Sequence, residues 1–242
     1  MNAALESPDT GEKIAACIID IDATITRPRG QPQIGPDYVL NNAIFEIIAQ
    51  LMQEHGWSPE AAERAMSDYA EAKLFWDYPE FLAEFDLPME EGWKRIVRWH
   101  EENIAVHDDA VRMIRRLHAA RLPLFIASNN PLSGCLLKLG RAGLAGREGS
   151  EYFHGIMGTN VCMGVKCSTG FWERCLEQVG HEPERLAVIG DDPHDDCRMP
   201  RSLGVETIFL VDRKQEARVK RTPEALWVNT LDCVPEFLAS PG

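Results

Sequence analysis

Two aspartates, Asp20 and Asp22, stand two positions apart at the end of an apolar run that covers residues 14–19. In an extended chain, residues i and i+2 point to the same side, so both carboxylates would face one small volume. Like charges in such a volume repel each other, so that one group must be neutral, paired with a positive group or bound to a cation. The pair therefore indicates a site that supplies positive charge.

Polar residues also follow two later apolar runs. Ser128 comes after the run at residues 122–127, and Asp191 comes after the run at residues 186–189. In open parallel sheets, ligands bind outside the carboxyl ends of the strands, where residues remote in sequence meet. We therefore expect these groups to converge with the first aspartate pair at one edge of a sheet.

The acidic charge at this edge predicts a hard divalent cation. The aspartates expected there are Asp20, Asp22, Asp191, Asp192, Asp195 and Asp196. Carboxylate oxygens suit Mg²⁺, which binds through one or two carboxylates together with waters and substrate phosphate. Lys166, just before a predicted helix, would add a positive side chain. The ion and the lysine together would let an anionic substrate approach a chain whose net charge is −13.

The elements that must position these residues alternate along the chain. A further apolar run at residues 207–211 is typical of a buried strand, and helical patterns cover residues 109–120 and 168–179. Ser168 is a good N-cap for the second helix, and Gly180 a good C-terminal stop. This alternation predicts an α/β fold with a Rossmann-like parallel sheet that has helices on both faces.

The alternation is interrupted between the first two strands by a long stretch of helical pattern without a strong strand signal. Within it, Ser58 followed by Pro59 predicts a helix start, with proline at the first helical position. We therefore expect two domains. They are a helical insert at residues 30–105 and an α/β core at residues 1–29 and 106–242, in which residues 1–12 form a flexible polar lead-in.

Composition and charge argue against several classes of protein. The acidic total disfavours nucleic-acid binding, which normally needs a basic face. No apolar stretch approaches the length of a membrane helix, and the first residues lack the features of a signal peptide. The cysteines, seven in number and without a CxxC pair, favour reduced thiols over disulfides or a zinc site. We expect a cytoplasmic protein, and no pattern specifies an oligomeric state.

The motifs and their order resemble the haloacid dehalogenase (HAD) superfamily. Residues 20–24, Asp-Ile-Asp-Ala-Thr, are similar to its first motif, DxDGT or DxDxT in the phosphatases. Ser128 at a strand end resembles the second motif, Lys166 the third, and Gly-Asp-Asp-Pro-His-Asp-Asp at residues 190–196 the fourth. The helical insert resembles the cap of the first subgroup, type C1.

The resemblance implies a Mg²⁺-dependent phosphohydrolase that acts on a small phosphorylated metabolite. Asp20 would be the nucleophile that forms an aspartyl-phosphate, and Asp22 the general acid and base. Lys166 would offset the charge of Asp20. The implied metal ligands are Asp20, the backbone carbonyl of Asp22, Asp191 and Asp196. The implied contacts to the phosphoryl oxygens are Thr24, Ser128, Asn129 and Lys166.

The sequence departs from the family pattern at two positions and leaves one ligand open. Ala23 replaces a common glycine and Cys167 a common proline, and we expect neither change to remove the chemistry. For the second acid of the fourth motif, Asp195 fits the shorter spacing and Asp196 the longer. The position of Gly204 favours Asp196.

Three other functions compete with a phosphatase. A dehalogenase would lack the second acid, so Asp22 argues against it. A phosphomutase of the sugar-phosphate type would keep both Asp20 and Asp22 and is the main alternative. A non-catalytic HAD-fold binding protein is disfavoured by the intact motifs. Substrate choice would depend on cap side chains, for which the candidates are Trp76, Tyr78, Arg95 and Arg98.

Overall fold

A computed structural model describes residues 14–29, 36–146 and 149–238. Within these residues a seven-stranded sheet has the order β5-β4-β1-β6-β7-β9-β8, and all its pairs are parallel except that of β8 with β9. The α/β prediction is confirmed. The strands are β1 (Ala16–Ile19), β4 (Leu124–Ala127), β5 (Gly155–Met157), β6 (Leu186–Gly190), β7 (Thr207–Val211), β8 (Val219–Arg221) and β9 (Leu226–Val228).

Strand β1 lies inside the sheet, between β4 and β6, and all of its residues are buried. Cys17 and Ile19 pack into the apolar cluster on one face, whereas Ile18 packs into the cluster on the other. A strand covered on both faces needs apolar residues at every position, which explains the unbroken run in the sequence.

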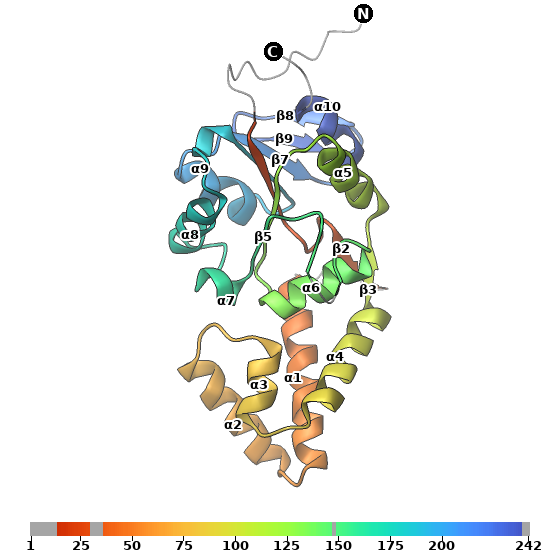
Figure 1. Ribbon diagram of the computed structural model, residues 1–242, viewed down its shortest axis with the longest axis vertical. Coiled ribbons are helices and arrows are strands. Elements are labelled where there is room, and N and C mark those ends of the chain that lie inside the picture. Colours follow the sequence, from red (N-terminus) through yellow and green to blue (C-terminus); the bar gives the residue numbers. More distant parts are fainter. Residues whose placement is uncertain (1–13, 30–35, 147–148, 239–242) are drawn as a thin grey trace, which may run out of the picture.

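Helices cover both faces of the sheet, as Figure 1 shows. One face packs against α5 (Asp108–Ala119), α6 (Leu132–Arg141) and α10 (Val234–Leu238). The other packs against α7 (Thr159–Cys162), α8 (Thr169–Val179), the short helical turn η2 (His194–Arg198) and α9 (Met199–Ser202). Within the described segments, six of the seven cysteines are buried, where they act as small apolar side chains.

The predicted helix ends lie where their capping residues place them. Ser168 accepts a hydrogen bond from the backbone N–H of Phe171, and Gly180 adopts the left-handed conformation with φ 71°. Ser58 likewise accepts from the backbone N–H of Ala61 at the predicted helix start in the insert. Side-chain caps satisfy backbone donors that the helix itself leaves free.

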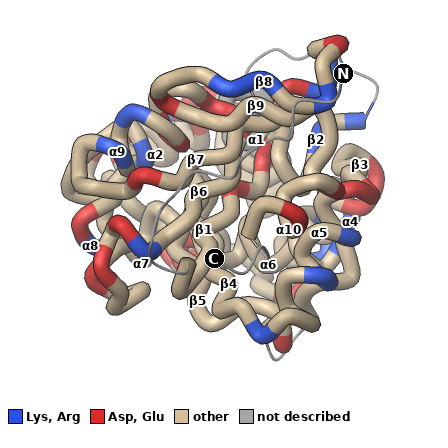
Figure 2. The backbone as a smooth tube through the Cα atoms, turned by 90° about the horizontal axis from the view of Figure 1, so that it is seen from above, with Lys and Arg blue, Asp and Glu red and all other residues tan. Residues whose placement is uncertain are grey.

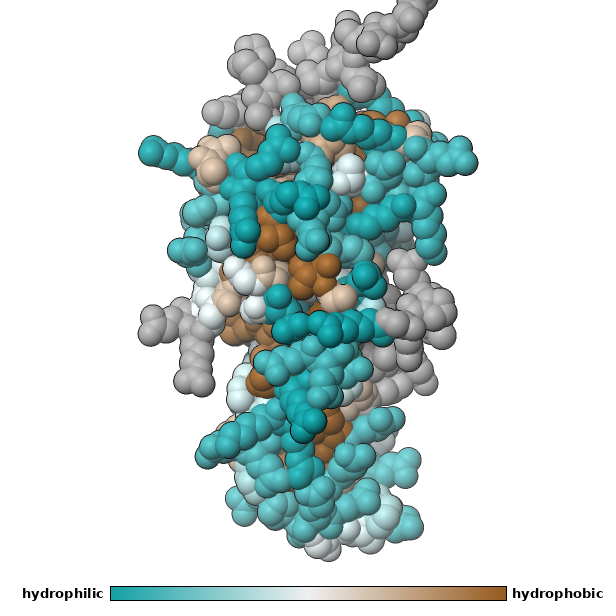
Figure 3. All heavy atoms as spheres, turned by 90° about the vertical axis from the view of Figure 1, so that its right-hand side faces the viewer, coloured by the Kyte–Doolittle hydropathy of each residue, from teal (hydrophilic) through white to brown (hydrophobic). Residues whose placement is uncertain are grey.

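The insertion between the first two strands of the main sheet is helical, as predicted. It contains α1 (Pro36–Glu54), α2 (Pro59–Ala72), α3 (Tyr78–Glu84) and α4 (Met89–Asn103). These helices enclose their own apolar core and form the lower lobe in Figure 1. On the face seen in Figure 3, hydrophilic residues cover most of this lobe.

Several short strands were not predicted. An antiparallel pair, β2 (Thr26–Pro28) and β3 (Ile104–Val106), joins the helical lobe to the core, and β5 and β8 were also missed. Strands of three residues carry too little periodicity to be recognised in a sequence.

The surface of the described residues fits the composition. In Figure 2, acidic and basic residues are interspersed around the core rather than separated onto two sides. Of the helices that the structure describes, none is both long and apolar enough to cross a lipid bilayer.

Candidate active site

Parallel pairing brings the predicted polar residues to one edge of the sheet. Strand β1 ends just before Asp20, and it pairs in parallel with β4, which ends before Ser128, and with β6, which ends before Asp191. Because the three strands run in the same direction and are neighbours, their carboxyl ends lie side by side. This edge is where open α/β sheets bind ligands.

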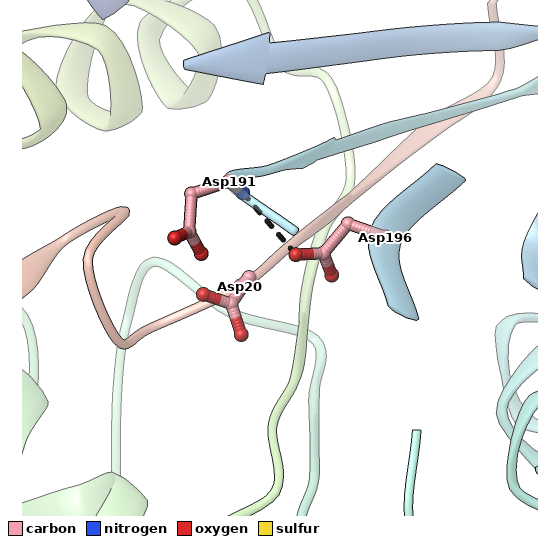
Figure 4. A group of neighbouring side chains, drawn as sticks. All are labelled: Asp20, Asp191 and Asp196. Carbon is pink, nitrogen blue, oxygen red and sulfur yellow. Dashed lines mark hydrogen bonds between the residues drawn. The ribbon is translucent and has the colours of Figure 1, made fainter. Parts of the chain in front are cut away.

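Three carboxylates form a compact group at this edge. Asp20, Asp191 and Asp196 each offer one oxygen, and these oxygens lie within 4.8 Å of one another. In Figure 4 they come from three elements, with Asp20 after β1, Asp191 after β6 and Asp196 on the helical turn that follows. The donor set is the kind that a hard divalent cation prefers.

The two candidate acids of the fourth motif have different surroundings. Asp196 is buried, and its Oδ2 accepts the backbone N–H groups of Asp191 at 3.2 Å and Asp192 at 3.1 Å. Asp195 instead lies with Oδ1 2.9 Å from the ring of His194, and its Oδ2 accepts from Asn129. The group of three therefore includes Asp196 and not Asp195.

Lys166 is the positive side chain of this group. Its Nζ lies 2.6 Å from Oδ1 of Asp20 and also contacts Oδ1 of Asp196. Burial works against the charged form, but the two carboxylates outweigh it and raise the pKa of Lys166 above its ordinary value. The lysine is therefore charged at neutral pH, and one ammonium group stands against three carboxyl groups.

The carboxyl groups are short of positive charge. Burial raises the pKa of Asp20 well above its ordinary value, against the lowering effect of Lys166. Burial, and then the charge of Asp196, raise the pKa of Asp191 to about 7. In addition, Oδ2 of Asp20 is buried without a hydrogen-bond partner among the described residues. A bound divalent cation would relieve the repulsion, so these residues fit one.

Asp22 lies outside the group of three and has its own partners. Nζ of Lys138, on α6, lies 2.7 Å from Oδ1 and 2.6 Å from Oδ2 of Asp22. Asn130 also donates to Oδ2 at 2.6 Å. Neither Lys138 nor Asn130 was predicted. One signal was present, because Lys138 stands three residues after the buried Cys135 and so shares the apolar face of a helix.

The residues expected to contact phosphoryl oxygens lie at the same edge, but they differ in which of their polar side-chain atoms already have hydrogen-bond partners in the protein. Thr24 is fully buried, and no described residue is a hydrogen-bond partner of its Oγ1. The Oγ of Ser128 accepts from the backbone and the side chain of Asn130. Asn129 uses its amide within the protein, where it accepts from the backbone N–H of Lys166 and donates to Asp195.

Arg213 binds the backbone of the loop that follows β1, a contact that was not predicted from the sequence. Its Nη1 donates to the carbonyl of Ala23 at 2.8 Å, and its Nη2 donates to the carbonyl of Thr24 at 3.0 Å. Nη2 also pairs with Asp109. Ala23 adopts the left-handed conformation, with φ 56°, at the position where the family pattern often has glycine.

The cap meets the core at α6. Asp77, just before α3, accepts from the backbone N–H of Ser133, and the buried Tyr78 lies against Gly134. The other cap candidates have different roles. Trp76 packs among the aromatic rings of the cap, and Arg95 and Arg98 pair with glutamates on exposed parts of the helices.

Comparison with known families agrees with this geometry. Residues 14–204 match the family model of the haloacid dehalogenase-like hydrolases. The chain belongs to this family and is a hydrolase. The helical insertion after the first motif agrees with the cap type that the sequence resemblance implied. No curated protein sequence matches the chain.

Solved structures share the fold at low sequence identity. A HAD phosphatase from Thermococcus onnurineus is 21% identical with a TM-score of 0.57, covering 94% of this chain and 98% of its own. The putative HAD-hydrolase YfnB from Bacillus subtilis, bound to magnesium, is 14% identical with a TM-score of 0.55 and covers 94% and 99%. CbbY from Rhodobacter sphaeroides, in complex with phosphate, is 18% identical with a TM-score of 0.57 and covers 94% and 100%.

Structures with other activities in their names are also similar, among them an L-2-haloacid dehalogenase and a putative β-phosphoglucomutase. At these identities the likeness shows the fold, and the activity has to be argued from the site.

Proposed function

We propose that this hydrolase is a Mg²⁺-dependent phosphatase that cleaves a small phosphomonoester through an aspartyl-phosphate. The observation that carries the proposal is the environment of Asp20. This buried carboxylate has one oxygen on Lys166 and the other without a hydrogen-bond partner in the described structure, and a second acid, Asp22, follows two residues later. A nucleophile and an acid–base group beside one substrate are what the two steps require.

The residues proposed to hold Mg²⁺ are Asp20, Asp191, Asp196 and the backbone carbonyl of Asp22. When bound, the ion would offset the negative charge of the phosphoryl oxygens. The proposal is supported by the geometry of the three carboxylates, whose oxygens lie within 4.8 Å of one another.

In the first step the free oxygen of Asp20 attacks phosphorus. The bond between phosphorus and the leaving oxygen breaks, and Asp22 gives that oxygen a proton. In the second step Asp22 takes a proton from a water molecule, which attacks phosphorus. The bond to Asp20 then breaks, phosphate is released, and the first protonation state returns.

The phosphoryl oxygens would be held by hydroxyl and cationic groups at the same edge. Thr24 offers a buried hydroxyl, Ser128 offers its hydroxyl at the end of β4, and Lys166 offers charge. Asn129 would act through its main-chain N–H, because its amide is used by Lys166 and Asp195. Fixed dipoles and charges of this kind need no reorganisation during the reaction.

The cap, proposed to span residues 30–105, would close over the substrate, exclude water and restrict the size of the leaving group. Asp22, which accepts hydrogen bonds from Lys138, Asn130 and Thr26, argues against a dehalogenase, which would have no use for a second acid. A phosphomutase would keep the same pair of aspartates, so the assay must separate the two activities.

The test is a panel of phosphomonoesters incubated with the protein and Mg²⁺, with released phosphate as the measurement. We expect release from at least one compound and its loss on chelation of the metal. Asp20→Asn should abolish turnover, whereas Asp68→Asn, on the exposed side of α2, should leave it unchanged. Isomerisation of a sugar phosphate without phosphate release would support the mutase, and substantial turnover by Asp20→Asn would rule out the covalent mechanism.

A further inference from the structure

We propose that Lys138 is a positioning residue that holds the carboxylate of Asp22 in place for proton transfer. The inference rests on the proposed function, because it assigns a purpose to a lysine through the acid–base group of that reaction. Lys138 stands outside the four motifs that the sequence resemblance uses, and it comes from α6 on the flank of the site.

The contacts of Lys138 account for its whole ammonium group. The group has three N–H donors, and three acceptor atoms lie within hydrogen-bond distance. These are Oδ1 of Asp22 at 2.7 Å, Oδ2 of Asp22 at 2.6 Å and Oδ1 of Asn130 at 2.6 Å. The side chain of Lys138 is fully buried. A buried ammonium group requires such partners, and all three acceptors of Lys138 belong to Asp22 and Asn130.

The contacts also restrict the aspartate. Asp22 lies three residues after the end of β1, and a β-bridge to Thr26 holds its backbone, but two side-chain torsions must still be set. Lys138 donates to both carboxylate oxygens of Asp22, and the side-chain amide of Asn130 donates to Oδ2 as well. Asp22, Lys138 and Asn130 thus form one hydrogen-bond network. The amide of Asn130 also donates to Ser128. The network therefore fixes the side-chain torsions of Asp22 relative to Ser128, which is proposed to hold phosphate.

The helix that carries Lys138 is itself fixed from both sides. Cys135 and Leu139 of α6 pack into the core of the sheet, while Leu137 packs against the apolar cluster of the cap. The backbone N–H of Ser133, at the start of α6, donates to Asp77 of the cap. Lys138 thus projects from a helix held between the two lobes, which suits a residue that must place another group accurately.

A residue that acts through Asp22 has a specific kinetic signature. A poor leaving group, such as an alkoxide, needs the proton from Asp22, whereas p-nitrophenolate leaves readily without it. Misplacing Asp22 should therefore impair cleavage of alkyl phosphates much more than cleavage of p-nitrophenyl phosphate. A residue needed only for folding would affect both substrates equally. The ratio kcat/KM is the right measure, because it covers the steps up to departure of the leaving group.

The first experiment compares wild type with Lys138→Met, which removes the charge and keeps an unbranched side chain. For the best alkyl phosphomonoester of the panel, we expect kcat/KM to fall by about 100-fold or more, the scale of general acid catalysis, and for p-nitrophenyl phosphate by less than about 10-fold. Lys94→Met, which breaks an exposed ion pair with Glu90, is the matched control and should change neither value. Equal losses for the two substrates would overturn the proposal.

The second experiment is a double-mutant cycle with the alkyl phosphomonoester of the first experiment, because the loss expected from Lys138→Met alone is large for that substrate. If Lys138 acts through Asp22, then adding Lys138→Met to Asp22→Asn should lower kcat/KM by no more than about twofold. Losses that multiply across the two substitutions would show that Lys138 acts independently, which contradicts the inference. Should Lys138→Met fail to fold, Lys138→Gln replaces it, since glutamine removes the charge but keeps a polar end in the buried site. The same selective loss for alkyl phosphates supports the proposal, and equal or no loss overturns it.

A structural measurement separates this inference from the proposed function. Wild-type protein that releases no phosphate from any compound would refute the phosphatase, yet crystals of wild type and Lys138→Met still report the position of Asp22. We expect the carboxylate to turn away from its wild-type position in the variant. An Asp22 side chain that keeps its place without Lys138 would overturn the positioning role.

Discussion

Gly190 and Asp196 lie so close together that the structure has no room for a side chain at position 190. A Cβ atom there would lie 2.2 Å from Cγ and 2.3 Å from Oδ2 of Asp196. Gly190 is the last residue of β6, and Asp191 follows it directly. The absence of a side chain at the strand end is therefore a condition for two of the three clustered carboxylates to meet.

The first prediction is that Gly190→Ala displaces Asp196 and weakens Mg²⁺ binding by at least about 10-fold, the scale seen when partners of metal ligands are lost. The measurement is the Mg²⁺ dependence of phosphate release, or calorimetry with Mg²⁺ alone. Gly170→Ala is the control, because its Cβ meets no atom within 4 Å and it lies in α8. An unchanged Mg²⁺ affinity in Gly190→Ala would contradict the prediction.

The two neighbouring acids of the fourth motif should behave differently. We expect Asp196→Asn to weaken Mg²⁺ binding by about 10-fold or more, because it removes a charge from the buried group of three. Asp195→Asn should change the affinity by less than about threefold, since Asp195 contacts His194 and Asn129 instead. Titration of both variants with Mg²⁺ checks this, and a larger effect at Asp195 would exchange their roles.

Ala23 should be a position of stored backbone strain. Its left-handed conformation costs an ordinary residue about 1–2 kcal/mol, which glycine avoids, although glycine also gains freedom in the unfolded chain. We therefore expect Ala23→Gly to raise the free energy of unfolding by up to about 1 kcal/mol, measured by urea denaturation.

The control for this substitution is Ala61→Gly, on the exposed face of α2, which should lower stability by about 1 kcal/mol. Opposite signs for the same chemical change would attribute the effect to the backbone angle. If Ala23→Gly destabilised the protein as much as Ala61→Gly, the backbone of Ala23, whose carbonyl accepts from Arg213, would not be strained.

The buried His100 of α4 should make stability depend on pH. Burial lowers the pKa of His100 to about 4, from an ordinary value of 6.5. Between these pH values the unfolded chain binds more protons than the folded one. The contribution of the neutral, buried His100 to the free energy of unfolding is therefore complete above pH 6.5 and is lost as the pH falls toward 4. The loss from this residue is on the order of 3 kcal/mol.

The measurement is the free energy of unfolding at pH 7 and pH 4.5 for wild type and His100→Asn. Nδ1 of His100 donates to the carbonyl of Ile96, and Asn103 makes the same bond to Trp99 one turn later, so asparagine can keep the contact. We expect a smaller drop for this variant. His181→Asn, at an exposed residue, is the control, and an identical drop in all three proteins would refute the role of His100.

The sequence alone determined the core strands and the motifs, for a local reason. Strands β1, β6 and β7 are covered on both faces, so each appears as a nearly unbroken apolar run that ends where a polar residue begins. Helix caps such as Ser168 and Gly180 are also local signals. Spacing of this kind was enough to predict the parallel sheet, the helical insertion and the family.

Only the tertiary structure decided which side chains meet. Lys138 and Asp22 are 116 residues apart, and nothing in the spacing of either predicts a contact across two elements of the core. Asp195 and Asp196 are adjacent in sequence, but successive residues of a helical turn point in different directions, so only the fold selects the one that reaches Asp20. Such contacts depend on how α6 and the turn after β6 pack, and packing involves residues from the whole chain.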